Sequence, residues 1–96
     1  MTEASYYILL SLLGPNHGYG IMQKTAQMSG ERVSLAAGTL YGALQNLVEK
    51  GWISALKTEK NSRKKEYLIT ELGERVLRIE LERLQELVKN GEALLS

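Results

Sequence analysis

The sequence predicts a mainly α-helical domain that carries one small β-hairpin. Apolar residues recur at helical spacing in four segments, and two short β-rich stretches with a polar, basic stretch between them lie before the last of these segments. No repeat, low-complexity tract or linker interrupts the 96 residues, so we expect one structural unit.

The first two helices are indicated by their apolar spacing and by the residues that end them. Residues 6–13 are apolar on nearly every side, which predicts a helix that neighbours bury and that stops at the Gly-Pro-Asn turn of residues 14–16. A second helix begins near Gly18 and stops at Gly30. Apolar and polar residues alternate over residues 33–35, which predicts an extended link able to pair with a sheet.

The third helix, from about residue 37 to 50, is predicted to have one buried face and an almost uncharged outer face. The apolar positions that define the buried face are Leu40, Leu44, Leu47 and Val48. The side chains that then look outward are Thr39, Gly42, Gln45 and Asn46. Small, hydrogen-bonding side chains suit a helix that enters a DNA groove. An ordinary, modestly polar surface helix has the same periodicity.

Two strands and a long helix complete the chain. Residues 52–58 and 66–70 each have a strand pattern, and the polar stretch between them forms the tip of a hairpin. Thr70 then caps a last helix that runs to about Leu95. Three helices, a hairpin and a long helix are the order of a winged helix-turn-helix. We assign residues 1–70 to a DNA-binding winged helix-turn-helix and 71–96 to a C-terminal dimerisation helix.

The last helix has the heptad spacing of a helix–helix seam. At about 1.5 Å per residue it is roughly 37 Å long, which is more than so small a domain can cover. A homodimer interface is therefore expected, and one wide core stripe in a monomer is the alternative. The predicted dimerisation residues are Leu77, Leu81, Leu84, Val88 and Leu95.

Positive and negative residues are distributed unevenly along the chain, although the net charge is only +1. Residues 1–66 hold eight Lys or Arg against five Glu, whereas residues 67–96 hold four against six. The hairpin concentrates positive charge at Lys57, Lys60, Arg63, Lys64 and Lys65. Such a cluster is an electrostatic footprint for phosphate, although a solvated hairpin tip is also often charged.

Several functions are disfavoured by composition. The chain has no cysteine, no aspartate and a single histidine, His17, so we expect neither a metal site nor a cofactor, and no enzyme. A chain without cysteine suits a reducing cytoplasm. The apolar run 6–13 is too short to span a bilayer and lacks the basic flank of a secretory signal, so no membrane association is expected.

Four spaced motifs give the chain a resemblance to the PadR-like transcriptional regulators over nearly its whole length. They are YILLSLL at 7–13, HGYGI at 17–21, GTLY at 38–41 with Leu44, Leu47 and GWI at 51–53, and YLITELG at 67–73. The resemblance implies a dimeric winged-helix repressor whose third helix enters the major groove, whose wing touches the flanking backbone and whose last helix dimerises.

Carried over residue by residue, the resemblance implies a DNA-binding set in two groups. On the third helix the set comprises Thr39, Tyr41, Gln45 and Asn46, with Gln45 as the candidate for reading adenine. Tyr41 can instead pack its ring on the second helix. On the wing the set comprises Lys60, Arg63, Lys64 and Lys65, which would neutralise phosphates.

Two departures from the family pattern are visible. Many members have serine or proline before the Gly-Thr motif, whereas this chain has Ala36-Ala37, which removes a helix cap. Members with a short C-terminal part can stack flat aromatic ligands on a tryptophan of the dimer helix, a position that is Leu84 here. The corresponding effector-binding positions are Tyr7, Leu81, Leu84 and Val88, an apolar lining with one aromatic residue.

The sequence therefore predicts a homodimeric regulator of transcription, a repressor that binds double-stranded DNA at a near-palindromic operator. A small apolar or aromatic effector is a candidate for releasing it. The alternative is a winged-helix adapter for protein–protein interaction, in which the same outer face contacts a protein. Salt-sensitive binding to duplex DNA separates the two.

Overall fold

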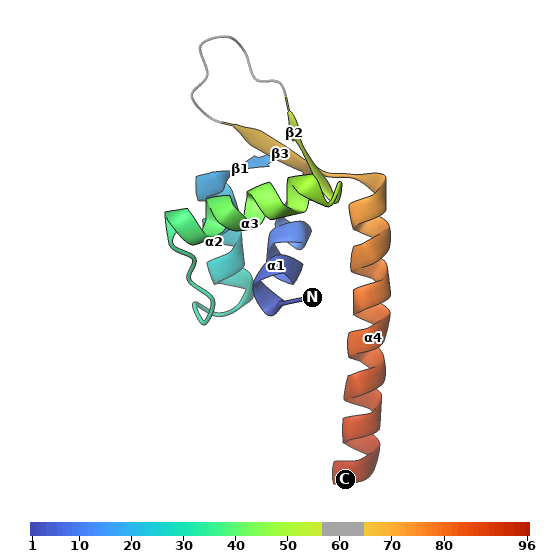
Figure 1. The fold of residues 1–96 in the computed structure, drawn as a ribbon. Coiled ribbons are helices and arrows are strands. Elements are labelled where there is room, and N and C mark those ends of the chain that lie inside the picture. Colours follow the sequence, from blue (N-terminus) through green and yellow to red (C-terminus); the bar gives the residue numbers. More distant parts are fainter. Residues whose placement is uncertain (57–64) are drawn as a thin grey trace.

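A computed structural model describes residues 1–56 and 65–96, and within them it confirms the mainly helical class. Figure 1 shows a cluster of short helices with a small sheet above it and one long helix at its side. In chain order the elements are α1 (Glu3–Ser11), β1 (Asn16–His17), α2 (Gly18–Met28), α3 (Ala37–Glu49), β2 (Ile53–Leu56), β3 (Glu66–Ile69) and α4 (Glu71–Leu95).

The hydrophobic core lies where the three short helices, the sheet and the start of α4 meet. Its buried members are Ile8, Leu9, Leu12, Ile21, Leu40, Leu44, Leu47, Ile53, Tyr67 and Leu77. The predicted first helix ends earlier than expected: α1 stops at Ser11, and Leu13 lies beyond it with 55% of its surface exposed.

The sheet has three antiparallel strands in the order β1-β3-β2. The two predicted strands form the hairpin, in which Ala55 lies opposite Tyr67. The third strand, β1, was not predicted, because its two residues are too short for an alternating pattern. The prediction that residues 33–35 pair with a sheet was wrong for the described residues, since β1 takes the free edge of β3 and Leu35 packs on the core.

Helix α3 starts and ends as its sequence indicates. Ala36 occupies the N-cap without any side-chain hydrogen bond to the helix, as expected from the lost serine or proline. Gly51 ends the helix with φ +74°, a backbone conformation that glycine adopts at little cost. One member of the predicted buried face was wrong, since Val48 is 39% exposed.

The start of α4 is fixed by a compact set of contacts. The hydroxyl of Thr70 accepts a hydrogen bond from the backbone N–H of Gly73 (3.0 Å) and donates one to the carbonyl of Gly51 (2.6 Å). The backbone N–H of Thr70 donates to the carbonyl of Trp52 at 2.9 Å. The predicted cap is thus confirmed, and it ties the sheet to the long helix.

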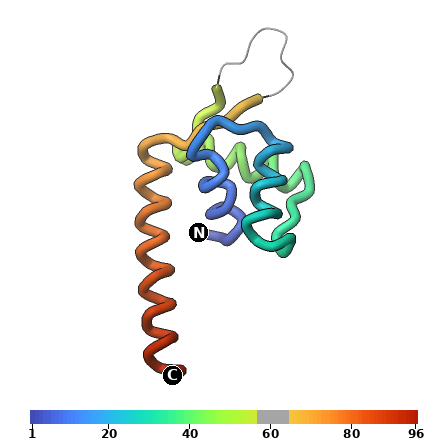
Figure 2. Tube along the Cα trace, turned by 180° about the vertical axis from the view of Figure 1, so that it is seen from behind, coloured from blue at the N-terminus to red at the C-terminus, as the bar shows by residue number. Residues whose placement is uncertain are grey.

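Helix α4 packs on α1 through its first half and then extends past the rest of the chain (Figures 1 and 2). The molecule is accordingly elongated, with extents of 57 × 28 × 19 Å. Among the described residues, none of the helices combines the length and the apolar character needed to cross a bilayer.

Candidate nucleic-acid interface

The outer face of α3 is exposed and includes two glycines, which have no side chain. Thr39, Gln45 and Asn46 are all exposed, as predicted from the helical phase. Gly38 and Gly42 lie on the same face, and a Cβ built on either meets nothing within 4 Å. The face therefore presents hydroxyl and amide groups with little side-chain bulk between them, which allows another molecule to approach the helix backbone closely.

Tyr41 lies at the edge of this face, and its position combines the two predicted alternatives. Its side chain is 52% exposed, so it is available to a ligand. Its hydroxyl also rests against Gly18, the first residue of α2, where a Cβ would lie only 2.7 Å from the hydroxyl oxygen. The ring therefore leans on α2, and the glycine leaves the space that the hydroxyl occupies.

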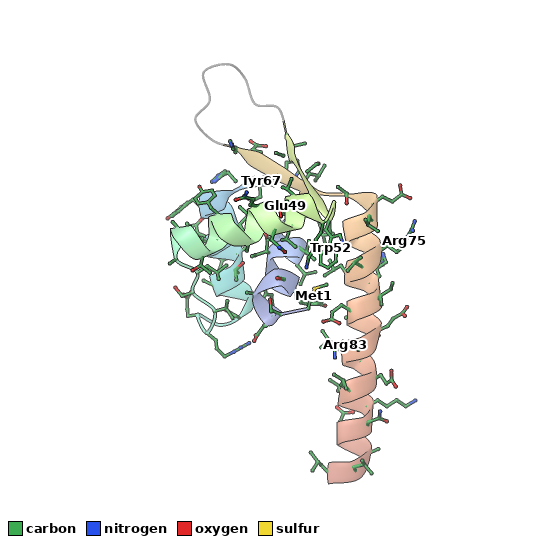
Figure 3. The ribbon with its side chains drawn as sticks, in the orientation of Figure 1. Met1, Glu49, Trp52, Tyr67, Arg75 and Arg83 are labelled. Atoms are coloured by element: carbon green, nitrogen blue, oxygen red, sulfur yellow. The ribbon has the colours of Figure 1, made fainter. Side chains whose placement is uncertain are left out.

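A hollow that we call the wing notch lies between α3 and the hairpin. It has a volume of about 340 Å³ and is lined by Tyr41, Gln45, Val48, Ala55, Lys65 and Tyr67. Figure 3 shows Tyr67 on the side of the sheet that faces α3. Three of these residues, Val48, Ala55 and Tyr67, were not among the predicted site residues, because only the packing of the hairpin on α3 brings them together.

The predicted basic cluster lies mostly outside the described residues. Lys60, Arg63 and Lys64 are not among the residues that the structure describes. Lys65 is described, is exposed, and contributes to the wing notch. The structure thus places one of the four predicted wing cations next to the outer face of α3.

The predicted dimerisation residues differ in burial within the protomer. Leu77 is 5% exposed and belongs to the core of its own chain, whereas Leu84 is half-buried. The exposed fractions of the other three are 43% for Leu81, 58% for Val88 and 91% for Leu95. Burial falls along α4 because the helix outruns the body of the domain (Figure 1).

Further apolar side chains on α4 are uncovered. Ile79 is 62% exposed, Leu87 53% and Leu94 86%. Large contiguous apolar surface is uncommon on monomeric proteins and marks an interaction site. Within the protomer, the second half of α4 therefore leaves several large apolar side chains exposed.

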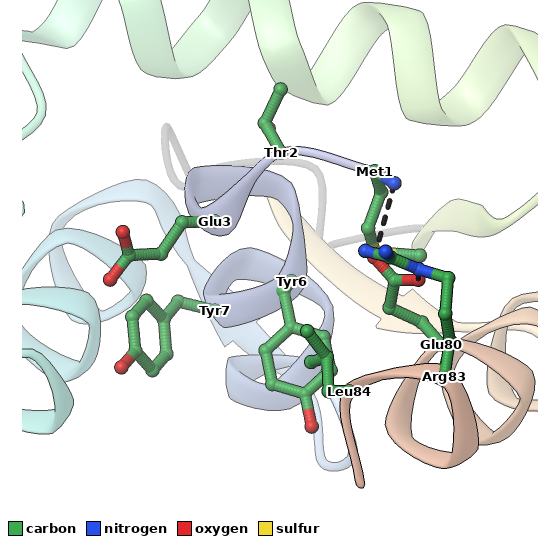
Figure 4. A pocket seen from close by; sticks show the side chains of 8 residues that line it. All are labelled: Met1, Thr2, Glu3, Tyr6, Tyr7, Glu80, Arg83 and Leu84. Carbon is green, nitrogen blue, oxygen red and sulfur yellow. Dashed lines mark hydrogen bonds and ion pairs between the residues drawn. The ribbon is translucent and has the colours of Figure 1, made fainter. Parts of the chain in front are cut away.

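A cleft between α1 and α4 holds the ion pairs that Glu80 makes with Arg83 and with the amine of Met1. It has a volume of about 350 Å³, and its walls are Met1, Thr2, Glu3, Tyr6, Tyr7, Glu80, Arg83 and Leu84 (Figure 4). Arg83 donates two hydrogen bonds to Glu80, at 2.6 and 2.9 Å, and the amine of Met1 donates a third at 3.1 Å. These bonds, from Arg83 first and the amine second, lower the pKa of Glu80 to about 2.

Three of the four predicted effector positions are divided between clefts that the described residues form. Tyr7 and Leu84 line the cleft just described, and Leu81 lines a second cleft of about 210 Å³ nearer the start of α4. Val88 lies on the exposed part of α4. The aromatic residue common to both clefts is Tyr6, which the sequence analysis did not single out. In Figure 4 Tyr6 points toward Leu84, whereas Tyr7 points away from it.

The lone histidine has a structural position that sequence reasoning missed. His17 is the N-cap of α2, and its Nδ1 accepts a hydrogen bond from the backbone N–H of Gly20 at 3.3 Å. The neighbouring Asn16 side chain accepts from the backbone N–H of His17 at 2.9 Å. The signal was present in the sequence, because a polar residue directly before a helical segment is a candidate cap.

Known proteins are similar to this chain in sequence and in fold. A protein from Streptomyces fradiae, described as an uncharacterized 37.1 kDa protein in transposon TN4556, is 37% identical over 76 residues. Those residues are 78% of this chain and 21% of that protein, so the chain spans about a fifth of its relative's length. A PadR family transcription regulator from Clostridium difficile R20291 superposes with a TM-score of 0.79 at 25% identity, over 99% of this chain and 100% of that chain.

A DNA-bound structure is also similar. PadR from Bacillus subtilis in complex with operator DNA matches with a TM-score of 0.68 and 29% identity, over 80% of this chain and 45% of that one. Residues 8–79 match the transcriptional regulator PadR-like family. That segment covers the core, the outer face of α3, the hairpin and the first third of α4, and the chain therefore belongs to the PadR-like family.

Proposed function

We propose that the protein is a homodimeric repressor that binds a near-palindromic DNA operator. Its family is one of transcriptional regulators rather than enzymes. The observation that carries the proposal is the outer face of α3, where exposed hydroxyl and amide groups stand beside two glycines with open space above them. The operator complex of the Bacillus subtilis relative supports DNA as the partner.

Base reading is assigned to the middle of α3. A glutamine or asparagine amide can pair with both N6 and N7 of adenine, and such a pair discriminates by about 1–3 kcal/mol against a wrong base. Gln45 and Asn46 are both exposed on this face, and Gln45 also borders the wing notch. We therefore assign direct reading to Gln45 and a supporting contact to Asn46.

Backbone anchoring is assigned to the start of α3. The first amide groups of a helix have no partner within it, and Ala36 supplies no side-chain cap. A DNA phosphate satisfies such amides and is favoured by the helix dipole. The Thr39 hydroxyl, in the first turn of the helix, can donate to the same phosphate.

The hairpin supplies electrostatic affinity. The five cations between residues 57 and 65 are accompanied by a single acid, Glu59. Each phosphate contact adds about 0.9 to the slope of log affinity against log salt on duplex DNA. Two subunits that each make two or three contacts would lose roughly a thousandfold in affinity between low and moderate salt.

Dimerisation is assigned to the uncovered face of α4. The exposed leucine and valine side chains of its second half have no cover in the described chain, and a second copy of α4 offers a matching apolar surface. A two-fold dimer would place its two α3 helices about one DNA turn, roughly 34 Å, apart, which gives the operator its near-palindromic form.

Release by a small apolar or aromatic effector is assigned to the α1–α4 clefts. Both clefts are lined by Tyr6 and by leucines of α4. A ligand that changes the packing of α4 on α1 would change the spacing of the two α3 helices in the dimer. We therefore predict that an effector bound in these clefts changes the affinity for the operator without contacting α3.

Selection of duplexes from a random pool with the purified protein tests the proposal. We expect enrichment of a two-fold symmetric sequence, and binding that weakens steeply with salt. Gln45→Ala should then relax the preference at one position in each half-site, whereas Gln27→Ala, an exposed glutamine on α2, should change nothing. Recovery of no preferred sequence, or an unaltered preference in Gln45→Ala, would contradict the assignment.

A further inference from the structure

We propose that the wing notch is a binding site, called the seat below, for one sugar–phosphate unit of the DNA backbone. This unit lies on the strand that separates the groove entered by α3 from the groove beside the hairpin. In this seat the phosphate accepts hydrogen bonds from Tyr41, Tyr67 and Lys65, and the deoxyribose packs on Val48 and Ala55. The inference rests on the proposed DNA-binding function and adds a binding site to it.

The polar groups of the notch suit an anion. The polar residues that line the notch are Tyr41, Tyr67, Gln45 and Lys65, whose side chains carry two phenol hydroxyls, one carboxamide and one ammonium group. All four can donate hydrogen bonds. Among the described residues that line the notch there is no carboxylate. A concave surface with several donors and no acid favours a phosphate, and charge-assisted hydrogen bonds make the attraction stronger than neutral ones.

The apolar side of the notch suits a sugar. Val48 exposes 39% of its surface although it lies next to the core face of α3, and Ala55 is exposed on β2. Val48 thus offers a partly exposed apolar side chain in the same hollow as Lys65 and the two tyrosines. A ligand with one apolar and one anionic end satisfies both sides, and a nucleotide of the backbone has that construction.

The register of the hairpin makes the notch donor-rich. Ala55 and Tyr67 are directly paired across β2 and β3, so their side chains lie on the same face of the sheet, toward α3. Glu66 alternates with Tyr67 and therefore faces the opposite side of the sheet. A shift of one residue in β3 would exchange the hydroxyl for a carboxylate and close the seat to phosphate.

The two tyrosines are held in place before DNA arrives. Tyr67 is 8% exposed and belongs to the core cluster, and the hydroxyl of Tyr41 rests against Gly18. Ordering a rotamer-rich side chain at an interface costs free energy. Hydrogen-bond donors that are already ordered avoid this cost, which favours the binding of one phosphate in a fixed position.

The position of the notch relative to DNA follows from the fold. When a helix lies in the major groove, the backbone strand at its flank separates that groove from the adjacent minor groove. The hairpin stands beside the flank of α3 that carries Tyr41 and Val48. The strand at that flank must therefore pass between α3 and the hairpin, which is the location of the notch.

The first test places a carboxylate in the seat. Val48→Glu should weaken both selected and scrambled duplexes by about tenfold or more, because a like charge is brought against the phosphate. Gln27→Glu on α2 is the matched control, since it makes the same change in net charge at an exposed site outside the notch. Circular dichroism melts of both variants check that the fold is retained. Equal affinity for Val48→Glu and the control would overturn the proposal.

The second test locates the phosphate itself. Neutral methylphosphonates are introduced one at a time along the selected duplex, and affinity is measured for the wild-type protein and for Tyr67→Phe, which removes one hydroxyl. In the wild type, a methylphosphonate at one position per half-site should lower affinity about tenfold more than a methylphosphonate at any other contacted phosphate. In Tyr67→Phe this additional loss of affinity should be several-fold smaller, whereas the losses at the other positions should be unchanged.

The outcomes separate the seat from the proposed function. A selected duplex whose methylphosphonate profile is identical in wild type and Tyr67→Phe would refute the seat and leave the DNA-binding function standing. A wild-type protein that binds no duplex would refute the function, and the seat with it. Coupling of Tyr67 to a single phosphate would establish both.

Discussion

Replacing Gly73 with alanine is expected to destabilise the fold, although alanine is the better helix former. Gly73 lies in the first turn of α4, and a Cβ built on it collides with the carbonyl oxygen of Trp52. That carbonyl is backbone and accepts the hydrogen bond from the N–H of Thr70 at 2.9 Å. It cannot move aside unless the bond is stretched or broken.

The magnitude follows from two opposing contributions. Alanine gains about 1 kcal/mol over glycine within a helix. Against this, overpacking costs about 1–3 kcal/mol and an unsatisfied backbone donor about 1–3 kcal/mol more. The sum is a net loss of roughly 1–5 kcal/mol. Since about 1 kcal/mol corresponds to 4–8 °C in a domain of this size, Tm should fall by at least about 4 °C.

A matched glycine gives the control. Gly42 in α3 has nothing within 4 Å of its Cβ position, so Gly42→Ala should raise Tm by a few degrees. Thermal melts followed by circular dichroism at one protein concentration compare the two variants with wild type. A Gly73→Ala protein as stable as wild type, or more stable, would show that the Trp52 carbonyl does not oppose the added methyl group, because helix propensity alone predicts that result.

Three other predictions follow from contacts elsewhere. Gly18→Ala should displace the Tyr41 hydroxyl and weaken DNA binding. In a protein that already carries Tyr41→Phe, Gly18→Ala should cause no further loss of DNA affinity. Additive losses would show that Gly18 acts independently of the hydroxyl. Leu81→Glu together with Leu84→Glu should give a monomer in light scattering, and a persistent dimer mass would move the interface off this face. Because the pKa of Glu80 is lowered to about 2, its stabilising effect is complete above about pH 4.5 and is lost as the pH falls toward 2. The Tm difference between wild type and Glu80→Gln should therefore narrow over that range, and a constant difference would contradict the ion pairs.

Local signals predicted the ends of elements well. The cap at Thr70, the missing cap at Ala36 and the glycine stop at Gly51 were all visible from single residues and their neighbours, and the structure confirms each of them. Such features depend on backbone hydrogen bonds within a few residues, so no knowledge of distant packing is needed.

Packing between distant segments was harder to predict. Val48 satisfies the apolar spacing of α3, yet it is exposed and lines the wing notch. Its exposure depends on how the distant strands pack on α3, which spacing within the helix does not show. The strand β1 is defined only by its partner β3. Tyr6 and Tyr7 are neighbours of similar chemistry, and the direction in which α1 meets α4 decides which of them faces Leu84.

DNA binding is best examined by fluorescence anisotropy of the purified protein with its selected duplex and with a scrambled one, each at low and at moderate salt. We expect tight binding to the selected duplex, weaker binding to the scrambled one, and a fall in both affinities of roughly a thousandfold as salt rises. Binding to neither duplex, or binding that is indifferent to both sequence and salt, would contradict the proposed DNA-binding function and favour a protein partner for the outer face of α3.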